Sequence, residues 1–148
     1  MNQRLVLFTK RLLDAMFYLG IVLTISLPFL FRWAGAYLKS FRTYYLPLTI
    51  LYVLSGVLCL MIVAQLRNMF DTVLEDNAFV YANVTSLKSM GKYSFLISIL
   101  SIARIFFSPT PATVVVVIVF AIAGLFSIVL CQVFEKAVRY KEENDLTI

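Results

Sequence analysis

The stretch from Ala112 to Val133 constrains the fold of this chain more than any other feature. It carries no charge, and its few polar side chains are Thr113, Ser127, Cys131 and Gln132. As a helix this stretch is about 33 Å long, enough to cross a hydrocarbon core of about 30 Å. A chain of 148 residues has too little other mass to enclose such a helix on all sides. The stretch therefore predicts an integral membrane protein.

Three further apolar segments complete the membrane part. The four predicted transmembrane helices lie at about residues 12–31, 45–66, 93–108 and 112–133. With a hydrophobic content of 61%, this pattern predicts an all-α, polytopic membrane protein with one membrane domain. The first segment also fits a signal peptide cleaved near Ala34–Ala36, although its apolar region is longer than the usual span of about 7–15 residues.

Two polar segments remain, a central one at residues 67–92 and a tail at residues 134–148. The central segment has two apolar stripes at helical spacing, separated by a turn at Glu75–Asn77. It therefore predicts an antiparallel helical hairpin that continues the second and third membrane helices. In the tail, Glu135, Arg139 and Glu143 follow one another at a spacing of i, i+4, which supports a helical continuation of the fourth.

The distribution of lysine and arginine predicts the orientation. Nine of the 13 basic residues lie in the N-terminus, the hairpin and the tail, three lie in the first loop, and Arg104 lies inside a span. Because basic residues concentrate on the cytoplasmic side, both termini and the hairpin are predicted to be cytoplasmic.

The composition argues against catalysis. The chain has no histidine, and its two cysteines, Cys59 and Cys131, lie in apolar segments. No nucleophile–base pair or metal set can be assembled from such residues, so we expect no enzyme activity, cofactor or metal site. The cysteines are interpreted as small core residues, with a disulfide or a metal pair as the alternative. The chain has no basic stripe with interleaved aromatic residues, so direct nucleic-acid binding is not expected.

Arg104 is the one charge well inside a predicted span. The simplest interpretation is that it snorkels to the outer interface. The alternative is that it faces an outward-open cavity and contacts an anionic group, such as a lipid phosphate. Asp14 is interpreted as a local pair with Lys10, one helical turn away.

The tail has an unusual ending. Its acidic residues lie at the C-terminal end of the predicted helix, where the helix dipole disfavours negative charge. The chain then finishes on the apolar residues Leu146 and Ile148. Such an ending gains from docking on a basic, apolar surface. That surface is either a partner protein or the chain's own hairpin beside Lys88 and Lys92.

Several short pieces resemble the domain of unknown function 2975 family of small bacterial membrane proteins. The matching pieces are Leu66-Arg67, Asn77-Ala78-Phe79, Asn83, Leu87, Gly91 and Tyr140–Ile148. The resemblance implies four membrane helices in the bacterial inner membrane and no established enzyme activity. It also implies a frequent genomic neighbour, a small helix-turn-helix regulator of the Cro/repressor type. Many relatives have proline at the position of Ala78.

Two functions fit these observations. The first is a non-enzymatic membrane protein whose hairpin and tail bind a soluble partner, such as that regulator. Its predicted binding residues are Asn77, Phe79, Asn83, Lys88, Glu142, Glu143, Asp145, Leu146 and Ile148. The second is an accessory or immunity-type subunit of a transporter, or a lipid-binding membrane module. Membrane lipids and a second copy of the chain are further expected partners.

Overall fold

The computed structural model describes residues 2–146, and these residues form helices without any strand. The helices are α1 (Gln3–Ala34), α2 (Lys39–Thr43), α3 (Tyr45–Leu74), α4 (Tyr81–Phe107) and α5 (Pro111–Leu146). All except α2 are long and apolar enough to cross a membrane. The prediction of an all-α protein with four such helices is therefore confirmed, and the short helix α2 in the first loop is an addition to it.

The long helices extend beyond the predicted spans at the ends that carry most of the charge. Helix α1 begins at Gln3 because the side chain of Asn2 caps it, accepting hydrogen bonds from the backbone N–H groups of Arg4 and Leu5 at 3.2 and 3.3 Å. Helix α3 continues to Leu74, and α5 runs through the tail to Leu146. The predicted hairpin and helical tail are thus both present.

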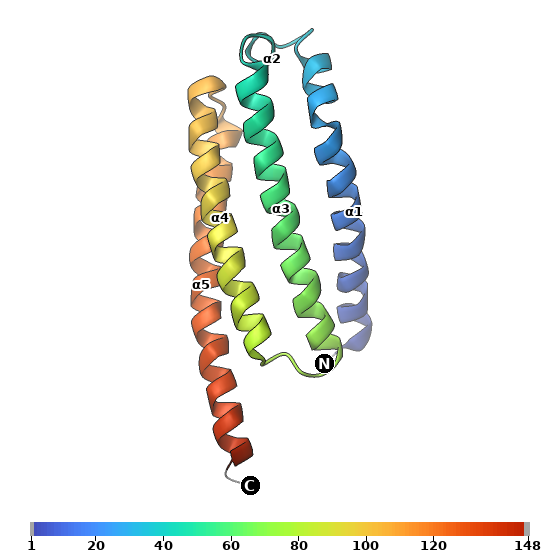
Figure 1. The fold of residues 1–148 in the computed structure, drawn as a ribbon, viewed down its shortest axis with the longest axis vertical. Coiled ribbons are helices and arrows are strands. Elements are labelled where there is room, and N and C mark those ends of the chain that lie inside the picture. Colours follow the sequence, from blue (N-terminus) through green and yellow to red (C-terminus); the bar gives the residue numbers. More distant parts are fainter. Residues whose placement is uncertain (1, 147–148) are drawn as a thin grey trace.

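The long helices pack in the order in which they occur in the chain. Helix α1 packs on α3, α3 on α4, and α4 on α5, whereas α1 has no comparable contact with α4 or α5. Figure 1 shows this open antiparallel arrangement, with α2 at one end and both termini at the other. We call these the α2 end and the charged end, the latter comprising residues 2–14, 67–92 and 132–146.

Glycines allow the close approach of neighbouring helices. A Cβ atom added at Gly124 of α5 would lie 3.0–3.1 Å from three ring carbons of Phe95 on α4. One added at Gly91 would lie 3.3 Å from the backbone oxygen of Gly124. A Cβ atom added at Gly20 or at Gly56 would come equally close to a side chain of the neighbouring helix, between α1 and α3. These positions are the close helix contacts expected of glycine in a membrane protein.

The interior of the membrane part is more polar than its surface. Helix α4 buries Ser94, Ser98, Ser101 and Arg104 along one face, and the hydroxyl of Ser98 donates to the carbonyl oxygen of Val117 on α5 at 2.9 Å. Small polar side chains bring helices together without leaving polar groups in contact with lipid. The apolar side chains of α1 and α5 point largely outward.

Charge is distributed unequally between the two ends. All eight acidic residues lie at the charged end, where nine basic residues nearly balance them. The α2 end and the adjoining span carry Arg32, Lys39, Arg42 and Arg104 with no acid. Acidic side chains are therefore available for recognition only at the charged end.

Candidate functional site

One buried side chain holds the turn between α3 and α4. Asn83 is only 2% exposed, and its Nδ2 donates to the hydroxyl of Thr72 at 2.7 Å and to the carbonyl oxygen of Ala78 at 2.6 Å. Thr72 belongs to α3 and Ala78 to the connection, so one amide group ties both to α4. The interpretation of Asn83 as a partner contact is therefore corrected, because this side chain is not on the surface.

An ion-pair network fixes α1 to α3 at the charged end. Arg67 Nε lies 2.6 Å from Asp14 Oδ1, and Lys10 Nζ lies 2.6 Å from Asp71 Oδ1. The predicted pair of Lys10 with Asp14 is present at 3.9 Å, but its partners on α3 were missed. A signal was available, since Arg67 and Asp71 repeat the basic-then-acidic i, i+4 order of Lys10 and Asp14. Two antiparallel helices with this same order place each basic residue opposite an acidic one.

The first part of the tail docks on the hairpin. The rings of Phe134 and Phe79 meet edge to face with centroids 5.3 Å apart, and Val138 is buried at 3% exposure. Lys141 Nζ donates to Asn77 Oδ1 at 2.7 Å. Lys141 therefore docks at the hairpin turn beside Asn77, whereas Glu135, earlier in the tail, lines a groove with the two lysines of α4.

A cavity of about 340 Å³ lies next to this contact. It is lined by Asn77, Phe79, Val80, Tyr81, Val138, Lys141, Glu142 and Asp145. Four of the predicted partner-binding residues, Asn77, Phe79, Glu142 and Asp145, are therefore brought together here. Lys88 lies elsewhere, in a groove between α4 and α5.

The end of the tail projects past the hairpin. We call residues Glu142–Leu146 the acidic tip. Figure 1 shows α5 extending beyond the α3–α4 turn. The carboxylates of Glu142, Glu143 and Asp145 form no salt bridge with any residue that the structure describes, and Leu146 is 86% exposed. Ile148, the last predicted contact, lies outside the described residues. The tip thus presents acidic and apolar groups on a helix anchored one turn earlier.

Arg104 is buried rather than snorkelling. Its side chain is 7% exposed, and its guanidinium carbon lies 4.3 Å from the centroid of the Tyr52 ring on α3. One terminal nitrogen donates to the hydroxyl of Ser101 at 2.9 Å, while Nε is buried without a hydrogen-bond partner among the described residues. The expected position of Arg104 at the outer interface is therefore corrected. Arg104 continues the buried face of α4 that carries the three serines, and this face turns its side chain inward, against an aromatic ring.

We expect Arg104→Met to change the free energy of unfolding by less than about 1 kcal/mol. Removing a charge from the membrane interior gains about 3 kcal/mol. This gain is offset by losing a cation–π contact of about 2 kcal/mol and a charged hydrogen bond of about 1.5 kcal/mol. Arg104→Lys should be worse, by about 2 kcal/mol, because it keeps the charge but loses the planar stack on Tyr52. Denaturant titration in micelles measures both, and a lysine variant as stable as the methionine variant would contradict this account.

The cysteines form no disulfide. Both Cys59 and Cys131 are free, and the thiol of Cys131 donates to the carbonyl oxygen of Val84 at 3.3 Å. Within residues 2–146 no group of three histidine, cysteine, aspartate or glutamate side chains is arranged to hold a metal ion. Cys131 packs with Leu87 and Met90 in the α4–α5 contact.

The fold defines a class: a polytopic helical protein with four apolar helices of membrane-spanning length. Residues 29–148 match the family model described as "Protein of unknown function (DUF2975)", so the chain belongs to this family. The family resemblance inferred from the hairpin and tail is thereby confirmed. No curated protein and no solved structure matches the chain.

Proposed function

We propose that the charged end faces the cytoplasm and binds a soluble regulator of the helix-turn-helix type, without enzymatic activity. The single observation that carries the proposal is the acidic tip, whose three carboxylates have no salt-bridge partner in residues 2–146 and whose Leu146 is exposed. A partner with a basic surface and an apolar groove complements such a tip.

The anchoring of the tail supports this proposal. The contacts of Phe134, Val138 and Lys141 with the hairpin hold the preceding turn of α5 in place. A preorganised surface loses less conformational entropy on binding than a disordered one. The cavity beside Asn77 and Phe79 gives the partner a place for an apolar side chain next to the carboxylates.

The chemistry of the tip suggests how regulation would work. DNA-binding proteins present lysine and arginine side chains to phosphates, and these contacts supply much of their affinity. Carboxylates on the tip would compete for the same basic surface. The membrane anchor would also keep the regulator away from DNA. The regulator would be released when this contact is broken.

The cytoplasmic orientation rests on the excess of basic residues at the charged end over the α2 loop. In a background without Cys59 and Cys131, single cysteines at Lys39 and Asn144 report the two ends. Membrane-impermeant thiol reagents applied to intact cells should label the first and spare the second. Labelling at residue 144 from outside would overturn the orientation and with it the proposal.

Deleting residues 142–148 should release the soluble partner and leave membrane insertion unchanged. The neutralising variant Glu142→Gln/Glu143→Gln/Asp145→Asn should do the same, because it removes the charges while keeping the helix. Glu75→Gln, an exposed acid at the hairpin, is the control that should retain the partner. Pull-down from native membranes and transcription of the neighbouring regulator's targets are the measurements.

Any of three results would contradict this proposal: the intact chain captures no soluble protein, the tip variants retain the partner, or the deletion acts only by lowering stability. Capture of another polytopic membrane protein instead would favour the role of an accessory membrane subunit.

A further inference from the structure

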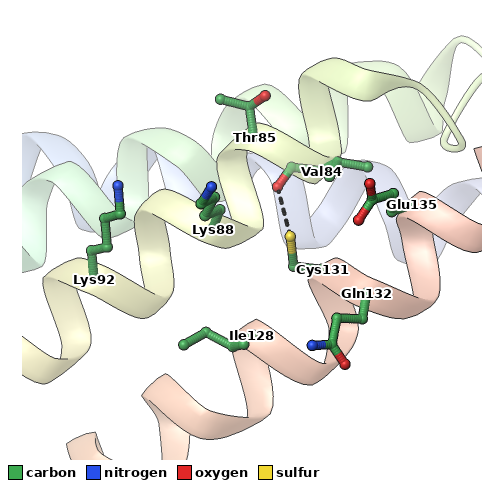
Figure 2. A pocket seen from close by; sticks show the side chains of 8 residues that line it. All are labelled: Val84, Thr85, Lys88, Lys92, Ile128, Cys131, Gln132 and Glu135. Carbon is green, nitrogen blue, oxygen red and sulfur yellow. Dashed lines mark hydrogen bonds between the residues drawn. The ribbon is translucent and has the colours of Figure 1, made fainter.

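A second groove lies between α4 and α5, on the membrane side of the tail contact. Its volume is about 440 Å³. Figure 2 shows its lining on facing turns of the two helices: Val84, Thr85, Lys88, Lys92, Ile128, Cys131, Gln132 and Glu135. The hydrogen bond from Cys131 to the carbonyl oxygen of Val84, drawn in the same view, links the two helices within the groove.

The groove straddles the boundary between the apolar and the charged parts of the chain. Lys92 is the last charged residue of α4 before Arg104, three turns further on, and Glu135 is the first charged residue of α5. Ile128 and Cys131 belong to the uncharged stretch of α5. The groove therefore lies at the depth of lipid headgroups, and the uncharged parts of α4 and α5 begin at its deeper edge.

The two lysines of the groove have no internal counter-ion. Lys88 and Lys92 are one helical turn apart and exposed, and neither forms a salt bridge or hydrogen bond with any residue from 2 to 146. The one acid of the groove, Glu135, is paired with Arg139 at 3.3 Å. Elsewhere at this end, Lys10 and Arg67 are neutralised by Asp71 and Asp14.

We propose that this groove binds an anionic phospholipid of the leaflet at the charged end. The ammonium groups of Lys88 and Lys92 hold the headgroup phosphate, and an acyl chain extends from there toward the α2 end, along the uncharged residues of α5 that precede Ile128. Thr85 and Gln132 lie nearer the charged end than the two lysines and offer polar groups to the headgroup. Basic pockets between transmembrane helices are a recurring form of anionic lipid site.

The lining favours a lipid over a soluble anion. A soluble phosphate would gain nothing from the apolar wall, whereas a phospholipid uses both the lysines and the aliphatic surface. The site also lies apart from the acidic tip, so it stands independently of the proposed partner. A bound lipid would fill the space between α4 and α5 beside the contact of Gly91 with Gly124, and so strengthen the base on which the tail is anchored.

The test uses the full chain in detergent micelles, titrated with phosphatidylglycerol or with zwitterionic phosphatidylcholine and followed by native mass spectrometry. The intact chain should bind phosphatidylglycerol in preference. A basic residue near a membrane surface contributes about a fivefold gain in affinity for anionic lipid. Lys88→Gln and Lys92→Gln should each weaken binding about fivefold, and the double variant about thirtyfold. Thr85→Trp, which narrows the groove without changing charge, should weaken binding as well.

The matched control is Arg4→Gln/Arg11→Gln, which removes two exposed basic side chains of α1 that also lie at the charged end. It should leave the preference for phosphatidylglycerol unchanged. Equal losses in the two double variants would mean non-specific attraction and would overturn the proposal. So would a Lys88/Lys92 variant that keeps the wild-type preference. Both lysines are exposed, and helicity by circular dichroism verifies that the variants fold.

Discussion

Replacing Gly124 with leucine should lower the free energy of unfolding by about 3 kcal/mol, the upper part of the usual range for overpacking. Even a Cβ atom at this position would lie within 3.1 Å of three ring carbons of Phe95, and a longer side chain has nowhere to go. A Cβ atom added at Gly91 would lie 3.3 Å from the backbone oxygen of Gly124, so the backbones of α4 and α5 approach closely here. No other pair of helices packs as extensively. The helices must therefore separate along their length.

Loss of helicity during denaturant titration in micelles measures this effect. Gly124→Ala should show a smaller loss of about 1 kcal/mol, because one methyl group can be met by a shift of the Phe95 ring. Val119→Leu is the control, since Val119 is 53% exposed on the outer face of the same helix. If Gly124→Leu lowers the free energy of unfolding no more than the control does, α4 and α5 do not meet at this point.

Apolar length predicted the four membrane helices, and the stripes of residues 67–92 predicted the hairpin. Both signals are local, because each depends on residues within one helix or two adjacent helices. The environment of Arg104 was missed because it depends on which face of α4 turns toward α3. The spacing of Ser94, Ser98 and Ser101, which continues to Arg104, was the available signal of a buried polar face.

Asn83 illustrates the same limit at the candidate site. It lies three residues after Val80 and four before Leu87, on the apolar stripe itself, so its burial follows from the periodicity that predicted the hairpin. Its polarity and its place in the family resemblance suggested a surface contact instead. The pairing of Lys141 with Asn77, 64 residues apart, has no comparable local signal. Such contacts follow from how the helices are placed relative to one another, which periodicity does not specify.

Replacing Asn83 with leucine should open the hairpin turn at a cost of about 2–3 kcal/mol. Leucine has the same branching as asparagine but removes both hydrogen bonds of the amide group, leaving the carbonyl oxygen of Ala78 without this donor. Its larger methyl groups must also fit a site that is only 2% exposed. Thr72→Val, which removes one of the two bonds, should cost about 1 kcal/mol. The loss should be local, because α1 and α3 remain tied by the pairs of Arg67 with Asp14 and of Lys10 with Asp71.

Hydrogen exchange separates a local from a global effect. In the Asn83→Leu variant, amides of residues 70–85 should exchange faster while those of the membrane helices keep their protection. Thr85→Val is the control, since the Thr85 hydroxyl bonds, among residues 2–146, only to the carbonyl oxygen of Tyr81 in its own helix, at 3.1 Å. Faster exchange should reach the tail as well, because Phe79 and Asn77, which hold Phe134 and Lys141, move with the turn. Unchanged exchange across residues 70–85 would show that the turn is held by other contacts, and that the acidic tip does not depend on Asn83 for its position.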